Sequence, residues 1–169
     1  MEIKEEGERE GKDKSAATAR DIDAIPVSKY MTKTVMTASL DQTIKSVCKI
    51  MNENNLGGLV IVKRGVSGNE PVGIITERDI IRKIGEVDLF TTQTPIRELM
   101  SKNLVTIKPD NTISDAIGLM HGNNIRRLPV IDNDGKIVGI ITDKDILKAA
   151  ARKSKLVTAY IPKEFNVED

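Results

Sequence analysis

The sequence contains very few aromatic side chains. It has two Tyr, two Phe and no Trp, so aromatic residues make up 2% of the chain. A buried core must therefore be aliphatic, built mainly from the Ile, Val, Leu and Met within the 39% of residues that are hydrophobic. The scarcity of aromatic rings also argues against the stacking surfaces that bind single-stranded nucleic acid. We therefore expect nucleic acid to be an unlikely partner.

Cysteine and histidine each occur once, as Cys48 and His121. A single cysteine excludes an internal disulfide and a cysteine-only metal cage, and a single histidine excludes a histidine-rich metal site. No phosphate-binding Walker loop, zinc-protease or serine-hydrolase motif is present. We expect Cys48 to be a core thiol and His121 a surface residue. The sequence thus predicts no enzyme, no catalytic residue, no metal ligand and no catalytic cofactor.

Net charge and long apolar runs are also lacking. The formal net charge is +1, so no overall field draws the protein toward nucleic acid or an anionic membrane. No apolar run approaches the roughly 20 residues of a membrane helix. The amino terminus is charged from its second residue, unlike a signal peptide. We therefore expect a cytoplasmic protein without a membrane partner.

The sequence does contain an internal duplication. The stretch Tyr30–Val62 matches Leu99–Ile131 with a constant separation of 69 positions. The stretch GIITERDII, which begins at Gly73, then matches GIITDKDIL, which begins at Gly139, with a separation of 66. The difference falls where KRGVSGNEP in the first copy faces DNDGKI in the second. Loops accept such insertions and packed elements do not, so the pattern indicates two copies of one unit.

Each copy predicts the order strand, helix, strand, strand, helix. The first helix of the second copy has apolar residues at steps of three and four, which place them on one face: Ile113, Ala116, Ile117 and Met120. Thr112 and Asp115 form a plausible cap pair, and Asn133-Asp134-Gly135 is a hairpin turn. The predicted elements are Val35–Thr37, Thr43–Asn54, Leu59–Val62, Val72–Thr76 and a helix after Thr76, then Leu104–Ile107, Thr112–Asn123, Leu128–Ile131, Ile137–Thr142 and a helix after Thr142.

Each copy has only about 50 residues, near the lower limit of independent stability. We therefore expect an α+β fold in which two βαββα repeats pack sheet to sheet with pseudo-two-fold symmetry. The predicted parts are a disordered charged tail (1–24), repeat 1 (25–84), a linker (85–94), repeat 2 (95–151) and a carboxyl-terminal tail (152–169). The last tail either packs on the body, contacts a partner or frays.

The string LPVID, followed by a glycine-containing turn and GIITDKD, resembles the CBS domain, named for cystathionine β-synthase. The first copy has LVIV, a longer turn and GIITERD. The resemblance covers about Val27 to Ala149. Two adjacent copies look like a CBS pair, or Bateman module, here standing alone, with the α/β-type CBS fold.

The resemblance implies that adenosine-containing ligands bind in clefts between the two repeats. The Asp of the T-x-x-D pattern would accept hydrogen bonds from ribose hydroxyls, and the Thr would lie near the ribose or phosphate. These residues are Thr76 and Asp79, and Thr142 and Asp145. The implied phosphate contacts are Arg78, Lys144, Arg126 and Arg127, and the implied neighbours of the base are Met36, Val105, Ile74 and Ile140.

The chemistry of the T-x-x-D pattern allows two interpretations. An ionised Asp only accepts hydrogen bonds, and a ribose diol offers two donors. However, Thr followed three residues later by an acid is also a helix-capping signature. In a single copy without the family pattern we would favour the cap. Two copies within that pattern favour a site, and the two roles are compatible.

The copies differ in charge at two adjacent positions of the implied site. The second copy has Arg126-Arg127 where the first has Gly57-Gly58. Adjacent arginines before a strand usually form a solvated surface, and their side chains point to opposite sides, so at most one should reach a given phosphate. The cleft around Asp79 would rely on Arg78, or borrow an arginine from the other repeat. We therefore predict two clefts of unequal affinity.

The leading hypothesis is a regulatory, energy-sensing module. It would bind adenine nucleotides, with AMP first and then ADP, ATP or S-adenosylmethionine, and it would signal to a separate effector protein. The resemblance makes a homodimer the expected assembly. The alternative is a ligand-independent dimerisation and interaction scaffold.

Overall fold

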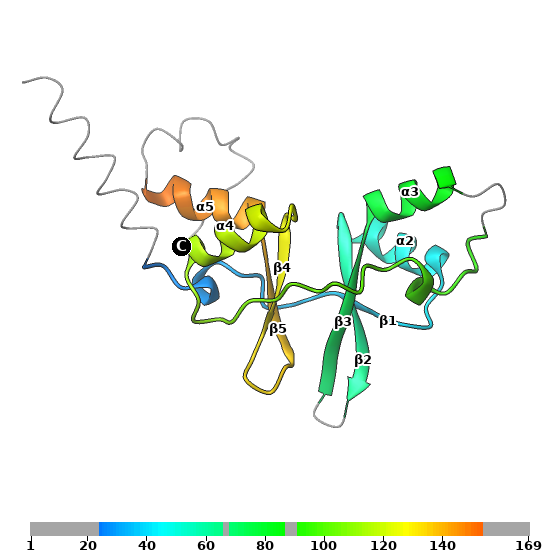
Figure 1. The fold of residues 1–169 in the computed structure, drawn as a ribbon, viewed down its shortest axis with the longest axis horizontal. Coiled ribbons are helices and arrows are strands. Elements are labelled where there is room, and N and C mark those ends of the chain that lie inside the picture. The colour runs from blue at the N-terminus through cyan, green and yellow to red at the C-terminus, as the bar shows by residue number, and fades with distance from the viewer. Residues whose placement is uncertain (1–23, 66–67, 87–90, 154–169) are drawn as a thin grey trace, which may run out of the picture. The chain divides into compact units, whose positions relative to one another are not determined.

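The computed structural model describes residues 24–65, 68–86 and 91–153 (Figure 1). The chain divides into two compact units. One, here called the first-repeat unit, comprises Thr32–Lys108 and Pro129–Ile140. The other, the second-repeat unit, comprises 24–31, 109–128 and 141–153 of the described residues.

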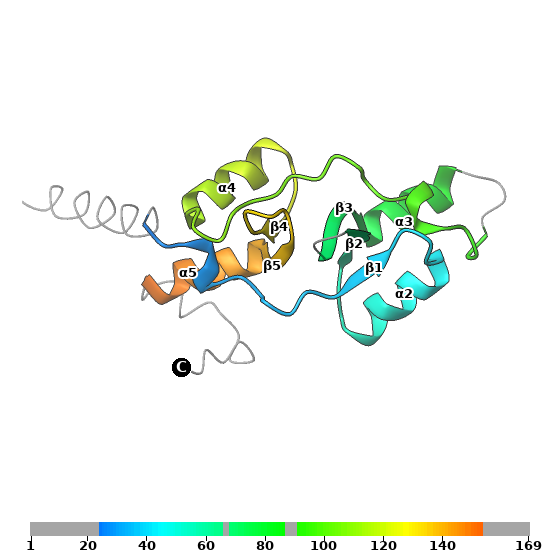
Figure 2. The same ribbon diagram turned by 90° about the horizontal axis from the view of Figure 1, so that it is seen from below.

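The first repeat follows the predicted order of elements. Strand β1 is followed by helix α2, strands β2 and β3, and helix α3. The sheet has the order β1-β2-β3, with β1 parallel and β3 antiparallel to β2, and both helices lie on the same side of it (Figures 1 and 2). The bounds are Thr37–Ser39 for β1, Ile44–Glu53 for α2, Gly58–Gly65 for β2, Gly68–Thr76 for β3 and Glu77–Glu86 for α3.

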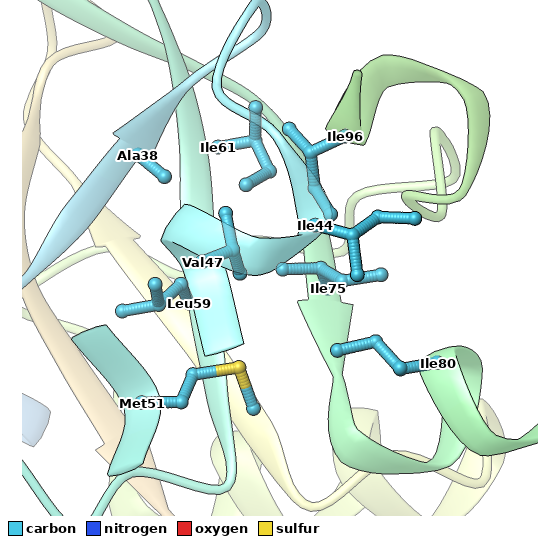
Figure 3. Packing of buried hydrophobic residues seen from close by; sticks show 9 residues of the cluster. All are labelled: Ala38, Ile44, Val47, Met51, Leu59, Ile61, Ile75, Ile80 and Ile96. Carbon is cyan, nitrogen blue, oxygen red and sulfur yellow. The ribbon is translucent and has the colours of Figure 1, made fainter. Parts of the chain in front are cut away.

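An aliphatic cluster holds the first repeat together (Figure 3). Helix α2 contributes side chains spaced three and four residues apart, because those positions share one face of a helix. Each fully buried aliphatic side chain contributes about 1.5–3 kcal/mol. Cys48 is half-buried against the cluster, as predicted for a core thiol, and burial raises the pKa of its thiol. The cluster consists of Ala38, Ile44, Val47, Met51, Leu59, Ile61, Ile75, Ile80 and Ile96.

The longer loop of the first copy was predicted wrongly. Most of the inserted residues extend the β2–β3 ladder, in which Lys63 pairs with Glu70 and Arg64 with Asn69. The register shifts between Ile61 and Val62, which is a bulge-like irregularity. The insertion therefore lengthens an antiparallel hairpin arm, and residues 66 and 67 lie outside the described part of the chain.

The second repeat contains helix α4 (Ile113–Gly122), strands β4 (Arg127–Ile131) and β5 (Ile137–Thr142), and helix α5 (Asp143–Lys153). The two helices contact each other. The predicted cap pair is confirmed, because Thr112 and Asp115 exchange hydrogen bonds of 2.8 and 3.1 Å in a capping box. His121 is exposed, as predicted.

The predicted strand Leu104–Ile107 does not form. Only Ile107 pairs, in a parallel bridge with Val130. In the first repeat β1 pairs Thr37 with Val60, whereas the position matching Val60 in the second repeat is Pro129. Proline has no N–H to donate to a ladder. The second repeat therefore keeps only an isolated bridge where the first has a three-residue strand.

Both α2 and α4 end in the same way. Asn55 and Asn124 each have a φ of 52°, in the left-handed region. The residue after each asparagine donates to a carbonyl of the last helical turn, Leu56 to Met51 at 2.8 Å and Ile125 to Met120 at 3.0 Å. This is a Schellman ending, and asparagine is the residue after glycine that best tolerates it.

The segments that precede the two repeats are exchanged. In the second-repeat unit, the Ile113 amide at the start of α4 donates to Ile25 at 2.8 Å. In the first-repeat unit, the Ile44 amide at the start of α2 donates to Thr94 at 3.0 Å. Short 3-10 helices follow in both segments, η1 (Val27–Lys29) and η2 (Ile96–Glu98). Each leading segment thus satisfies a helix-terminal amide of the other repeat.

Other predictions cannot be followed in the structure. The charged tail, apart from Ala24, and the carboxyl-terminal tail beyond residue 153 lie outside the described residues. Within the part of the chain that is described, no helix is long and apolar enough to cross a membrane.

Candidate functional site

The first T-x-x-D turn lies where β3 passes directly into α3. Oδ2 of Asp79 accepts two hydrogen bonds from Thr76, one from the backbone N–H at 2.9 Å and one from the hydroxyl at 2.6 Å. The Asp79 amide lies 3.3 Å from the Thr76 hydroxyl oxygen. The turn therefore fixes the carboxylate through one of its two oxygens.

The second turn, between β5 and α5, holds its aspartate through the corresponding two hydrogen bonds. Oδ2 of Asp145 accepts from the Thr142 N–H at 2.9 Å and from its hydroxyl at 2.7 Å. Asp145 is the one buried polar residue among the described residues. A buried carboxylate needs hydrogen-bond partners, and the turn supplies two of them.

These contacts show that both aspartates perform the capping role. They also leave Oδ1 of each carboxylate out of the turn, so the capping role does not exclude a second one. Oδ2 holds the turn, and Oδ1 is the atom that can accept a further hydrogen bond. The fixed carboxylate therefore presents a preorganised acceptor.

Two cations beside the aspartates were missed by the sequence analysis. Arg82 Nη2 donates to Asp79 Oδ1 at 3.1 Å. Lys148 Nζ lies 3.7 Å from Asp145 Oδ1. Both stand three residues after the aspartate, on the same helical face. A basic residue at that spacing in both copies was the signal that could have identified them.

The loop before β2 and β4 meets the same turn in each repeat. The Glu77 amide donates to the Gly57 carbonyl at 3.4 Å, and the Asp143 amide donates to the Arg126 carbonyl at 3.0 Å. Both repeats therefore make this backbone contact, but the residue that accepts it is Gly57 in the first repeat and Arg126 in the second. Arg126 is exposed beside the second turn, and Arg127 is half-buried at the start of β4. The first repeat offers glycine at both positions.

The remaining predicted residues lie in varied surroundings. Arg78 and Lys144 are exposed in the first turns of α3 and α5. Ile74 and Ile140 are half-buried and each forms a two-residue backbone bridge, with Ser101 and Thr32 respectively. In the first-repeat unit Met36 is exposed before β1, and Val105 is half-buried. The structure directly joins Thr76 to Asp79 and Thr142 to Asp145.

Charge at the helix starts restricts what the turns can bind. The first turn of α3 carries Glu77 and Asp79, and that of α5 carries Asp143 and Asp145. These carboxylates complement the positive ends of the helix dipoles. They also repel a phosphate placed directly on the helix start. A neutral hydroxyl donor therefore suits Oδ1 better than an anion, and a phosphate would need the basic side chains nearby.

A pocket of about 420 Å³ lies on the second-repeat unit, and Asp143 of the second turn is part of its lining. Its lining is mostly apolar and comes from α4, α5 and the turn after α4. Ile117 and Leu147 at this face are 43% and 60% exposed. The lining residues are Ile117, Met120, His121, Asn124, Ile125, Asp143, Ile146 and Leu147.

The described residues hold no cluster of His, Cys, Asp or Glu that could bind a metal ion. The chemistry available at the two turns is hydrogen bonding to a fixed carboxylate, with exposed cations close by.

A family model agrees with the duplication. The model described as the CBS domain matches residues 27–86 and again residues 96–152. CBS domain-containing protein YhcV of Bacillus subtilis is 36% identical over 126 residues, 71% of this chain and 81% of that protein. An uncharacterized protein of Methanopyrus kandleri is 34% identical over 125 residues, 74% of this chain. The chain spans 62% of that relative's length, and 46% of another relative, from Methanocaldococcus jannaschii.

Solved structures share the fold. The CBS domain pair of protein MJ0100, in complex with 5′-methylthioadenosine and S-adenosyl-L-methionine, is 29% identical with a TM-score of 0.68. The match covers 78% of this chain and 99% of that one. The mixed helix and strand content of both repeats is therefore the α+β fold of CBS pairs.

Proposed function

We propose, from the premise that this chain belongs to the CBS domain family, that it is a regulatory module which binds adenosine-containing ligands. In this proposal the T-x-x-D turns hold the ribose. The chain acts through a change of conformation or assembly rather than through catalysis. It signals to a separate effector protein.

The observation that carries the proposal is the fixed carboxylate of each turn. The backbone N–H and hydroxyl of the turn's threonine donate to Oδ2 of Asp79 and of Asp145 at 2.6–2.9 Å. Each carboxylate is therefore oriented before any ligand arrives. A preorganised acceptor loses little freedom when it binds a diol. The pair of ligands in the MJ0100 complex supports an adenosine group, because both of them contain one.

The basic side chains favour a ligand with a phosphate. Arg126 is exposed next to the second turn, and Lys144 stands on the first turn of α5. A guanidinium group binds phosphate oxygens through two parallel hydrogen bonds. We therefore place AMP first, followed by ADP, ATP and S-adenosylmethionine. The glycine at position 57 leaves the first repeat without this arginine, so its turn should bind AMP more weakly.

The experiment is a melting-temperature measurement with millimolar AMP, ADP, ATP, S-adenosylmethionine and 5′-methylthioadenosine. A ligand at 100 times its dissociation constant adds about 2.7 kcal/mol of stability, which is an easily measured shift. Asp145→Asn should reduce the shift strongly, and Asp79→Asn should reduce it less. Asparagine keeps a carbonyl oxygen for the threonine donors and removes the charge.

Asp115→Asn is the matched control. Asp115 accepts from the Thr112 amide at 2.8 Å, the same capping contact at a third helix start that no ligand is proposed to reach. If all three variants lower the shift equally, the turns are caps and nothing more. No shift with any ligand would contradict the proposal.

The rival function, a ligand-independent scaffold, is favoured by the apolar face of α4 and α5. Isolated exposed apolar residues are ordinary, but this face combines Ile117 and Leu147 with a pocket. Helix α3 likewise exposes Ile81 and Ile84, and Ile81 matches Leu147 in the repeat. The occupant proposed for these faces is a second copy of this chain, because a two-fold dimer places the same surfaces on both partners.

Sedimentation velocity tests the dimer. The wild-type chain should sediment as a dimer, and Leu147→Asp should shift it toward monomer, whereas Lys49→Asp on the exposed face of α2 should not. A dimer that forms and responds to Leu147→Asp, without any adenosine ligand shifting the melting temperature, selects the scaffold. A wild-type monomer contradicts the homodimer.

A further inference from the structure

The two aspartates differ in how closely a basic side chain of the protein approaches Oδ1, the carboxylate oxygen that the threonine does not bind. Each carboxylate oxygen has about two lone-pair positions. Oδ2 of both aspartates already accepts two hydrogen bonds from threonine. A diol that binds either carboxylate must therefore use Oδ1.

At Asp79 this oxygen is already engaged. Arg82 Nη2 donates to Oδ1 at 3.1 Å, a charge-assisted hydrogen bond. At Asp145, Lys148 Nζ lies 3.7 Å from Oδ1, which is beyond hydrogen-bond distance. The difference follows from the side chains, since a guanidinium group reaches with several donors and an ammonium group with a compact one.

Arg82 also has a second acceptor within reach. Its Nε lies 3.9 Å from Glu86 Oε1, one helical turn further along α3. The position matching Glu86 in the second repeat is Arg152. Arg82 can therefore release Asp79 and retain a carboxylate partner.

We propose that Arg82 is a specificity-determining residue that competes with the ligand for Asp79 and so lowers the affinity of the first turn for a ribose diol. This inference rests on the proposed function. It adds a cause of unequal affinity that is independent of Arg126 and of phosphate. Lys148, at its longer distance, competes less with a ligand at Asp145.

Adenosine is the sharpest probe, because it carries the diol without a phosphate. Calorimetric titration is made in two backgrounds, Asp145→Asn to isolate the first turn and Asp79→Asn to isolate the second. In the first background Arg82→Ala should tighten adenosine binding about two- to fivefold, the size expected from an exposed ion pair. In the second, Lys148→Arg should weaken binding. Lys83→Ala removes the same charge from the neighbouring position of α3 and should change nothing.

Salt provides a second readout. The Arg82 side chain is 63% exposed, so added salt screens its pairing with Asp79. Adenosine binding to the first turn should therefore become tighter as NaCl is raised from about 0.05 M to about 0.5 M. Arg82→Ala should remove that salt dependence.

The possible failures are distinguishable. Adenosine binding that requires Asp79 but is unchanged or weakened by Arg82→Ala overturns the competition alone. Absence of adenosine binding in the wild type and in every variant overturns the proposed function and this inference with it. Tightening by Lys83→Ala equal to that by Arg82→Ala also overturns the competition, because it would show a general effect of charge.

Discussion

The two repeats share several backbone contacts, but they differ in their first strand and in the side chains beside their T-x-x-D turns. Both have a threonine–aspartate turn, a helix amide bonded to the preceding loop, and an asparagine at the end of the first helix. The first repeat has glycine, a directly bonded Arg82 and a formed β1, whereas the second has Arg126, a more distant Lys148 and Pro129. The turn, the loop contact and the helix ending are therefore common to both repeats, whereas the first strand and the side chains beside the turn are not.

The largest effects should come from the cores, where the repeats are expected to be equal. Ile75 and Ile141 match in sequence and both have 0% exposure. Replacing either by alanine should lower the free energy of unfolding by about 2–5 kcal/mol, because methyl groups are lost and a cavity remains. Urea unfolding monitored by circular dichroism measures it.

Ile81→Ala serves as the control for that pair. Ile81 is 69% exposed, so the loss should stay within about 0.5 kcal/mol. A loss at Ile141 far below that at Ile75 would show that the second core collapses around the cavity and that the cores are unequal.

The turns should give the next largest effect and reveal a difference in burial. Asp145→Ala and Asp79→Ala each remove the acceptor of a threonine amide and hydroxyl, at a cost of about 1–2 kcal/mol. The larger loss is expected at Asp145, because Asp145 is buried and Asp79 only half-buried. Thermal unfolding without ligand measures both, with Asp145→Asn as the variant that keeps an acceptor. Equal losses would mean that burial has no influence on the cap.

The helix endings should be equal again, with a smaller effect. Asn55→Ala and Asn124→Ala place a Cβ-bearing residue without a local hydrogen-bonding group at a φ of 52°. Each should cost about 1 kcal/mol of stability, and glycine at either position should cost nothing. Chemical denaturation of the four variants tests this. Alanine tolerated at one repeat only would show that its helix ending relaxes.

The smallest effect concerns acid and separates the two helix starts. The Thr112 amide and hydroxyl hold the pKa of Asp115 below its ordinary value, and the matching residue in the first repeat is Ser46, which carries no charge. A carboxyl whose folded-state pKa is lowered stabilises the fold above its unfolded-state pKa. That contribution disappears as pH falls through the folded-state pKa.

Asp115→Ser should therefore be less stable than the wild type at pH 7, and the difference should shrink below about pH 4. Urea midpoints at pH 7 and in acid measure it. A difference independent of pH would mean that the serine hydroxyl replaces the carboxylate or that the cap is not ionic.

Local patterns made the helices and β5 predictable. Helices α2 and α4 begin one residue after their threonine caps, and β5 has the predicted bounds. Threonine caps and apolar spacing are encoded in consecutive residues, so a single sequence reveals them. The resemblance to the CBS domain was confirmed by the matches to both repeats.

Long-range pairings were less accessible. A strand was expected at Leu104–Ile107, because the effect of Pro129 depends on which strand it faces. The extension of β2 and β3 depends on pairing between Lys63 and Glu70, which the spacing of apolar residues in the sequence does not predict. The link from Arg82 to Asp79 was readable in principle, since both lie on one helix face. The exchange of leading segments left no pattern in the sequence.

That exchange makes the two repeats interdependent along the chain. Ile25 completes the start of α4, and Thr94 completes the start of α2. A fragment containing only residues 25–84 would include Ile25, whose partner on α4 is absent, and would lack Thr94, which accepts from the start of α2. Chain cleavage within residues 87–90 would leave each fragment still bound to the other through its leader. Each repeat therefore depends, for the start of its first helix, on a backbone contact with the segment that precedes the other repeat.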